Sequence, residues 1–99
     1  MSGYQTFQIM DLRLTLLRSL KDQPAYTAND RILQVEAQTF GLIQSRDVIR
    51  AELRWLSEVG AVSLKTAGSV MVATLTRRGH DHVAGLTVIE GVNRPSPEA

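Results

Sequence analysis

Three arginines spaced four residues apart, Arg46, Arg50 and Arg54, are the residues whose type and spacing point most directly to a chemistry. Successive residues of an α-helix turn by about 100°, so side chains four positions apart lie on one face. A guanidinium group can form two parallel hydrogen bonds with a phosphate, or with the O6 and N7 atoms of guanine. A row of arginines on the outer face of a helix therefore favours contact with nucleic acid.

The same stretch also has the apolar side that a packed helix needs. Ser45 can cap the helix at its start, and Gly41 and Gly60 provide the breaks on either side. We therefore predict a helix that follows Ser45 and runs to about Val59. Its apolar side consists of Val48, Ile49, Leu53, Leu56 and Val59.

The other patterns predict a small α+β fold that is mostly helical. Apolar periodicity and capping residues indicate the helices, and short β-branched runs around Ala67-Gly68-Ser69 indicate a hairpin. Three helices, a hairpin wing and a short C-terminal helix form the outline of a winged helix-turn-helix, with the third helix as the recognition helix. The expected elements are 6–21, 27–40, 46–59, 61–65, 70–75 and 77–84.

The chain of 99 residues has room for one hydrophobic core. We place the winged helix-turn-helix domain at residues 1–90 and a flexible tail at 91–99, where the sequence becomes polar and contains prolines. No apolar run is long enough for a membrane span and no signal peptide is evident, so we expect no contact with a membrane. The absence of cysteines fits a reducing compartment, and we expect a cytoplasmic protein.

The helix expected at 6–21 carries apolar side chains over an arc of roughly 220°, against roughly 100° for an ordinary surface helix. It should therefore pack against more than its own small core. One explanation is a homodimer through this helix, with Leu12 and Leu16 among the contacts. The other is that the C-terminal segment folds back over it.

We predict that the third helix, the hairpin and the last helix contact double-stranded DNA. The expected contacts are Ser45, Arg46, Arg50, Arg54, Lys65 and Arg77. The alternative is an ordinary solvated face with local ion pairs, because Asp47 and Glu58 interrupt the arginine row. Between residues 44 and 82, six basic residues stand against four acidic ones, a difference of only +2.

The remaining candidate residues favour structural roles. His80 and His82 point about 200° apart on a helix, so one metal ion cannot easily bind both, and we expect neither a metal site nor a cofactor. Glu52 lies on the apolar side of its helix and needs an internal partner, either Arg13 or a backbone N–H. Trp55 should be partly buried under the hairpin. No catalytic arrangement stands out, so we do not expect an enzyme.

Four stretches of the chain carry a further signal, and they are residues 45–56, 60–62, 72–79 and 91–97. These stretches resemble a family of short proteins encoded by Mu-like transposable bacteriophages and prophages. Members of this family are usually described as phage proteins with an ArsR-like winged helix, so the resemblance implies that fold and a place in the host cytoplasm. The chain lacks the Cys-x-Cys of ArsR metal sensors, and metal sensing is therefore not implied.

Two functions are consistent with these features. The first is a DNA-binding phage protein, either a transcription regulator or a DNA-handling accessory, and it rests on the arginine face within a helix-turn-helix. The second is a winged-helix adaptor that binds another phage protein during morphogenesis or DNA packaging. The nearly neutral charge, the acidic residues on the arginine face and the broadly apolar first helix motivate this second hypothesis.

Overall fold

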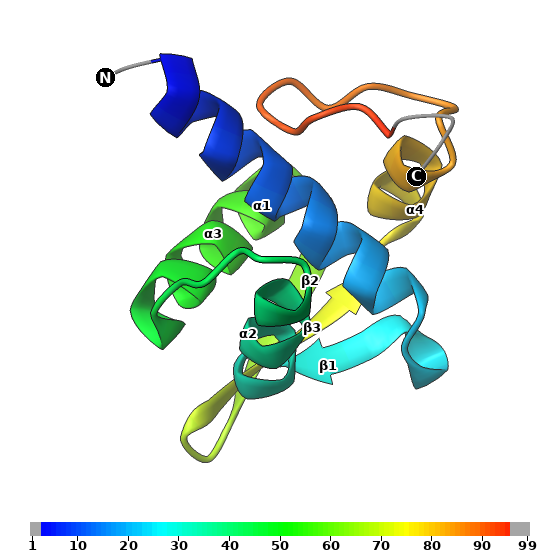
Figure 1. The fold of residues 1–99 in the computed structure, drawn as a ribbon. Helices are drawn as coiled ribbons and strands as arrows, with labels where there is room; N and C mark the ends of the chain where they lie inside the picture. The colour runs from blue at the N-terminus through cyan, green and yellow to red at the C-terminus, as the bar shows by residue number, and fades with distance from the viewer. Residues whose placement is uncertain (1–2, 96–99) are drawn as a thin grey trace.

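Helices cover one face of a small antiparallel sheet in this computed structural model, which describes residues 3–95 (Figure 1). The sheet has the strand order β1-β3-β2. In β3 the side chains alternate between buried and partly buried, as expected when one sheet face is covered. The elements are α1 (Gly3–Lys21), the 3-10 helix η1 (Pro24–Tyr26), β1 (Thr27–Asn29), α2 (Asp30–Thr39), α3 (Arg46–Glu58), β2 (Val62–Ala67), β3 (Val70–Leu75) and α4 (Arg77–Val83).

The expected α+β class, mostly helical, is confirmed by these elements. The α3 helix agrees closely with its prediction: the Ser45 hydroxyl accepts a hydrogen bond from the N–H of Val48 at 3.2 Å, as an N-cap does. Its apolar residues Ile49, Leu53 and Leu56 are fully buried. Burial of this stripe, rather than helix propensity, holds α3 against the rest of the domain.

The hairpin is longer than expected on its first strand, which reaches Ala67. Register runs from Val62 opposite Leu75 to Ala67 opposite Val70, so only Gly68 and Ser69 form the loop. A two-residue loop with positive φ at its first position favours glycine there, and Gly68 has φ +60°. This tight loop fixes where the backbone of Ser69 points.

The helix expected at 27–40 begins later than predicted, because Thr27–Asn29 forms the strand β1. This strand pairs with β3, from Thr27 opposite Thr74 to Asn29 opposite Val72. Asn29 then caps α2, and its side-chain oxygen accepts a hydrogen bond from the N–H of Ile32 at 2.9 Å. A strand of three residues is too short to show a period-two pattern in the sequence.

The C-terminal segment folds back over α1, which is one of the two explanations for that helix's broad apolar arc. Ile89 and Val92 are buried in the core, and the N–H of Asn93 donates to the carbonyl oxygen of Met10 at 3.2 Å. The structure thus differs from the expected flexible tail at 91–99, because packing continues to Asn93. The last part of that tail, residues 96–99, lies outside the described residues.

Burial also corrects the expected dimer contacts. Leu12 and Leu16 lie within the core of their own chain and are not available to a second copy. The exposed aromatic side chains of α1 are Tyr4 and Phe7, near its start. No helix within residues 3–95 is both long and apolar enough to cross a membrane.

His82 ties the C-terminal segment to α4. Its ring is buried, and Nδ1 accepts a hydrogen bond from the N–H of Ile89 at 3.0 Å. Because Nδ1 is an acceptor, the proton of the neutral ring lies on Nε2, which donates to the carbonyl oxygen of Asn93 at 2.8 Å. The ring therefore holds two points of the segment at once.

Replacement of Gly79 by alanine should destabilise the protein. A Cβ atom at this position of α4 would collide with the carbonyl oxygen of Ala61 and lie 2.7 Å from Cδ1 of Leu75. We expect a loss of about 1–3 kcal/mol from overpacking, although alanine favours an isolated helix by about 1 kcal/mol. The control Gly3→Ala adds a Cβ in open space. Urea denaturation of both variants measures the difference, and a Gly79→Ala variant as stable as Gly3→Ala would contradict this account.

Candidate nucleic-acid interface

Asp30, the first residue of α2, is a fully buried carboxylate with partners from two other elements. Its Oδ2 accepts hydrogen bonds from Nε of Arg46 at 2.9 Å and from Nη1 of Arg50 at 3.1 Å. Its Oδ1 accepts a hydrogen bond from the backbone N–H of Met71 in β3 at 3.2 Å. The carboxylate therefore joins the starts of α2 and α3 to the sheet.

The position of Asp30 follows from the end of β1. Asn29 pairs with Val72, so the next residue of β1 would lie opposite Met71. The chain turns into α2 at this point, and the side chain of Asp30 accepts the N–H that a longer β1 would have bonded. An unpaired buried N–H would cost roughly 1–3 kcal/mol. The side chain of Asp30 takes the place of the missing backbone acceptor and thereby stabilises this edge of the sheet.

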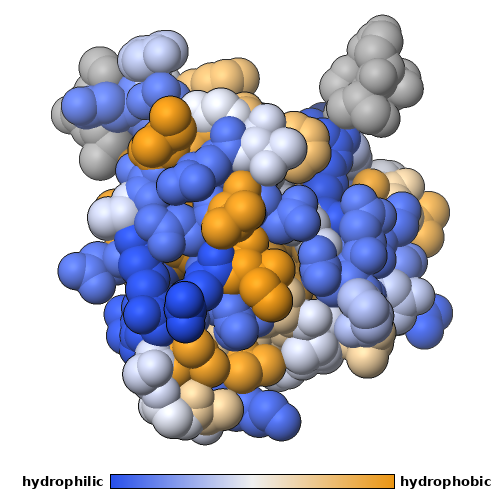
Figure 2. Space-filling model, turned by 60° about the horizontal axis from the view of Figure 1, so that its bottom comes forward, coloured by the Kyte–Doolittle hydropathy of each residue, from blue (hydrophilic) through white to orange (hydrophobic). Residues whose placement is uncertain are grey.

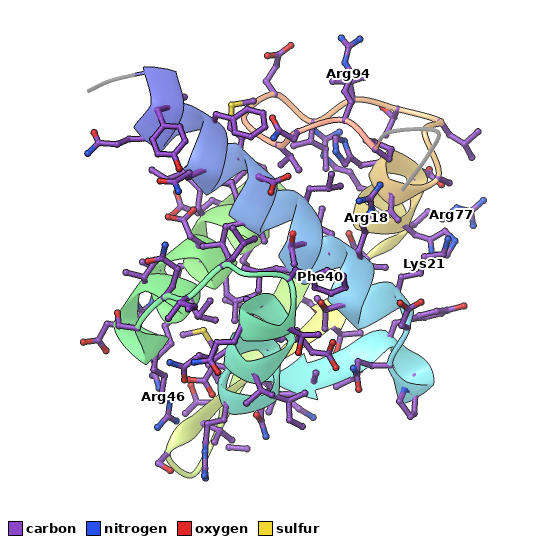
Figure 3. All side chains as sticks on the ribbon, viewed as in Figure 1. Arg18, Lys21, Phe40, Arg46, Arg77 and Arg94 are labelled. Carbon is purple, nitrogen blue, oxygen red and sulfur yellow. The ribbon has the colours of Figure 1, made fainter. Side chains whose placement is uncertain are left out.

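The hairpin loop joins the same network through a backbone carbonyl. The oxygen of Ser69 accepts from Nη2 of Arg46 at 2.6 Å and from Nη1 of Arg50 at 3.3 Å. Figure 3 shows Arg46 between the start of α3, α2 and the hairpin. We refer to Asp30, Arg46, Arg50 and Ser69 as the Asp30 cluster, which links α2, α3 and the β2–β3 loop.

The charges within the cluster decide the ionisation of Asp30. Burial alone would raise the pKa of its carboxyl group. The hydrogen bonds from Arg46 and from the N–H of Met71, together with the charges of Arg46 and Arg50, outweigh burial and lower the pKa below its ordinary value of 3.8. At neutral pH the carboxylate is therefore ionised and offsets one of the two arginine charges.

The structure brings together only part of the predicted DNA-contacting set. Ser45, Arg46 and Arg50 share the start of α3, and Arg54 lies one turn beyond Arg50, exposed to solvent. Strand alternation places Lys65 on the sheet face opposite the one that packs against the helices, since its neighbour Leu64 packs on the core. Lys65 is thus separated from the Asp30 cluster by the thickness of the hairpin.

Arg77 lies far from the Asp30 cluster. Arg77 is the first residue of α4, which follows the end of β3 that is distant from the hairpin loop. Figure 3 shows Arg77 on the other side of the molecule from Arg46. Its side chain is 92% exposed and forms an ion pair with Asp81 at 3.7 Å. An exposed pair of this kind contributes little to stability.

The outermost stripe of α3 is not basic. Arg46 and Arg50 are turned toward the hairpin and are only partly exposed, with 35% and 26% of their side chains accessible. The stripe that points most directly into solvent has one arginine and two acidic residues. It consists of Asp47, Ala51, Arg54 and Glu58. The basic groups therefore concentrate at the edge between α3 and the hairpin rather than along α3.

A partly buried polar group lies in the middle of α3. The prediction that Glu52 finds an internal partner is confirmed, and of the two candidates the partner is Arg13, with 2.7 Å between Oε1 and Nε. Arg13 also donates through Nη1 to the carbonyl oxygen of Gly91 at 2.9 Å, and its guanidinium lies 3.6 Å from the ring centroid of Trp55. Arg13 and the C-terminal segment at Gly91 lie against the ring of Trp55, whereas we expected cover from the hairpin.

The two histidines of α4 have separate surroundings. His80 contacts the ring of Tyr26 edge to face, with 5.6 Å between centroids, whereas His82 is buried. Among residues 3–95, no group of three or more His, Cys, Asp or Glu side chains is placed to hold a metal ion.

Large apolar side chains remain exposed on α2 and on the turn that follows it. Phe40 and Ile43 are 66% and 76% exposed, and Ile32 and Val35 are exposed on α2 itself. Figure 2 shows apolar and strongly hydrophilic side chains side by side on the lower face of the molecule. Exposed apolar residues gathered in one region commonly mark contact with another macromolecule.

Comparison with known proteins shows a relative that matches most of the chain. The chain is 42% identical over 89 residues to the uncharacterized protein gp26 of Escherichia phage Mu, which covers 90% of this chain and 92% of gp26. The chain belongs to the gp26 family of Mu-like phage proteins. This match supports the bacteriophage origin that the resemblance implied.

A second relative of this family occurs in a bacterium. An uncharacterized protein of Haemophilus influenzae (strain ATCC 51907 / DSM 11121 / KW20 / Rd) is 36% identical over 69 residues, which are 69% of this chain and 67% of that protein. No protein-family model and no solved structure matches the chain.

Replacement of Asp30 by asparagine should remove part of the acid sensitivity of folding. Because the pKa of Asp30 is lowered in the folded protein, its contribution is present above the unfolded value of 3.8 and is lost as the pH falls through the folded value. Asp30→Asn should cost about 1.5–3 kcal/mol at neutral pH, since hydrogen bonds to a charged group are lost. Between about pH 5 and pH 3 the wild type should then lose more stability than the variant.

The free energy of unfolding, measured in urea across this pH range, provides the comparison. Glu58→Gln is the control, because it removes an exposed carboxylate from the same region. Parallel pH profiles for the wild type and Asp30→Asn would show that the carboxylate does not stabilise the fold through its charge.

Proposed function

We propose that this protein is a winged helix-turn-helix that binds double-stranded DNA as a phage transcription regulator or DNA-handling accessory in the host cytoplasm. In this proposal α2 and α3 are the helix-turn-helix, α3 is the recognition helix, and the β2–β3 hairpin is the wing. The order of these elements and the tight hairpin directly after α3 support it.

The Asp30 cluster is the observation that carries the proposal. It orders the first turn of α3, where recognition helices place their base contacts, and fixes it to the loop of the hairpin. Arg46 and Arg50 remain partly exposed, with hydrogen-bond donors left over for a ligand. Side chains that are already ordered lose less entropy on binding, by about 0.5–1.5 kcal/mol for each long side chain.

The proposed interface is the edge formed by the start of α3 and the hairpin. Ser45, Arg46 and Arg50 lie at its centre, and Arg54 contacts a phosphate further along the groove. Lys65, on the outer face of the hairpin, reaches only the DNA backbone, and Arg77 lies outside the interface. Asp47 and Glu58 repel phosphate along the rest of α3, so the DNA contacts the edge rather than the length of the helix.

A second candidate function is supported by the exposed apolar residues. As a winged-helix adaptor, the protein would bind another phage protein in morphogenesis or DNA packaging through α2 and the turn after it. Phe40 and Ile43 expose more apolar surface than a DNA contact needs, because protein–DNA interfaces are polar and basic. This candidate requires no binding of duplex DNA.

Replacement of Arg46 by alanine should weaken the binding of a short DNA duplex. Arg50 still pairs with Asp30 in this variant, so the buried carboxylate keeps one partner. Because Arg46→Ala removes one positive charge from the interface, the slope of log affinity against log salt should become less steep by up to about 0.9. Arg77→Ala removes the same charge outside the interface and should leave both quantities unchanged. Fluorescence anisotropy at several salt concentrations measures affinity and slope.

Two outcomes would contradict the proposal. Equal losses in Arg46→Ala and Arg77→Ala would show that net charge, and not the edge of α3, controls binding. Failure of the wild type to bind any duplex at low salt, together with purification of a stable complex with a phage protein, would favour the adaptor.

Self-association through α1 remains part of the proposal, with changed contacts. Because Leu12 and Leu16 are buried, a second copy would contact Tyr4 and Phe7 instead. Phe7→Ser should therefore shift the protein from dimer to monomer in sedimentation velocity at a concentration where the wild type is dimeric. A wild type that sediments as a monomer at every concentration would show that this interface does not form.

A further inference from the structure

The hydrogen bonds of Arg46 use Nε and Nη2 of its guanidinium group and leave Nη1 without a partner among residues 3–95. A guanidinium has five N–H groups, arranged along three edges. Nε of Arg46 donates to Asp30 and Nη2 donates to Ser69, and these two nitrogens form one edge. Nη1 keeps both of its N–H groups and Nη2 keeps one, and we take the edge that these two nitrogens form as the one offered to a ligand.

Arg50 retains a complete edge in a different way. Both of its hydrogen bonds in the cluster run through Nη1, to Asp30 and to Ser69. The edge formed by Nε and Nη2 is left with its donors. The Asp30 cluster therefore orients two arginines and still leaves each able to form a paired contact.

The carboxylate of Asp30 also changes what this pair of arginines can bind. Affinity for phosphate follows charge, whereas reading of bases follows the direction of the donors. An ionised Asp30 reduces the net charge of the three side chains to +1, but it fixes the donor direction of Arg46. The lower net charge weakens binding to phosphates, which depends on charge alone. The fixed donor direction preserves binding to bases, which depends on geometry.

We propose that Asp30 is a specificity-determining residue, which positions Arg46 to read a guanine base in the major groove. The inference rests on the proposed binding of DNA. Guanine presents two acceptors, O6 and N7, that match the free edge of Arg46. Adenine presents one acceptor beside an amino group, which would face an N–H of the arginine. Asp30 itself is buried and acts only through Arg46.

Selection from duplexes with a randomised centre tests this role. The wild type should enrich a guanine at one fixed position of the bound sequences. Arg46→Lys keeps the charge beside Asp30 but lacks the fork, so it should bind DNA without enriching that guanine. Arg77→Lys is the matched control and should enrich the same guanine as the wild type.

The Asp30→Asn variant distinguishes a role of Asp30 in positioning Arg46 from a role in supporting the fold alone. Loss of the carboxylate charge should steepen the salt slope by about 0.9, because one more arginine charge becomes available to phosphate. In the wild type the preference for guanine should be roughly 5- to 150-fold, which is the range for a good paired contact. In Asp30→Asn this preference should fall toward none. A residue that merely supports the fold would instead weaken binding to every duplex without a steeper slope.

The outcomes separate this inference from the proposed function. A wild type that binds no duplex at low salt defeats both. A wild type that binds duplexes without any preferred base, or an Arg46→Lys variant that enriches the same guanine, overturns the role of Asp30 and leaves DNA binding in place. If thermal melting shows that Asp30→Asn is unfolded, the comparison of Arg46→Lys with Arg77→Lys decides the result.

Discussion

A buried carboxylate between two arginines is the interaction on which this structure most depends. Asp30 is inaccessible to solvent, and a charge in that position is tolerated only when it is paired and hydrogen-bonded. Its partners come from α3 and β3, while Asp30 itself begins α2. Loss of both arginines would leave the buried carboxylate uncompensated, so the relative positions of α2, α3 and the hairpin are set together.

A second interaction holds α3 from the opposite side. Arg13 of α1 bonds Glu52, lies over Trp55 and reaches the carbonyl oxygen of Gly91. The C-terminal segment is thereby attached to both α1 and α3, and His82 attaches it to α4. Asp30 thus holds the first turn of α3, and Arg13 holds its middle. In the proposed function, this rigidity is what lets a small surface with little net charge bind one kind of site.

The features that depend on local sequence were predictable. Ser45 as an N-cap, the apolar stripe of α3 and the glycine of the hairpin loop each act over a few residues, and the helix and hairpin they predict are confirmed. The need of Glu52 for an internal partner was also predictable, because a carboxylate on an apolar face must be paired, and Arg13 was one of the two candidates. Lys65 and Arg77 were grouped with Arg46 because the sequence does not show which sheet face or which end of a strand a cation occupies.

The features that depend on distant pairing were not predictable. The strand β1 has three residues and is defined only by its register with β3. Asp30 lies 16 residues before Arg46 and 20 before Arg50, and no spacing rule connects residues so far apart. Ile89 and Val92 lie outside any periodic segment, so their burial could not be read from the pattern. In each case tertiary contacts, and not local preference, determine the structure.

The proposed function requires DNA to bind at the edge where the Asp30 cluster joins α3 to the hairpin. Titration of ¹⁵N-labelled protein with a short duplex, followed through the backbone N–H and arginine Nε–H signals, tests it most directly. The account predicts that the largest changes fall on Ser45, Arg46, Arg50 and Ser69, and that the Nε–H of Arg46 stays protected by its bond to Asp30. Changes centred instead on Phe40 and Ile43, or no change on addition of any duplex, would contradict it.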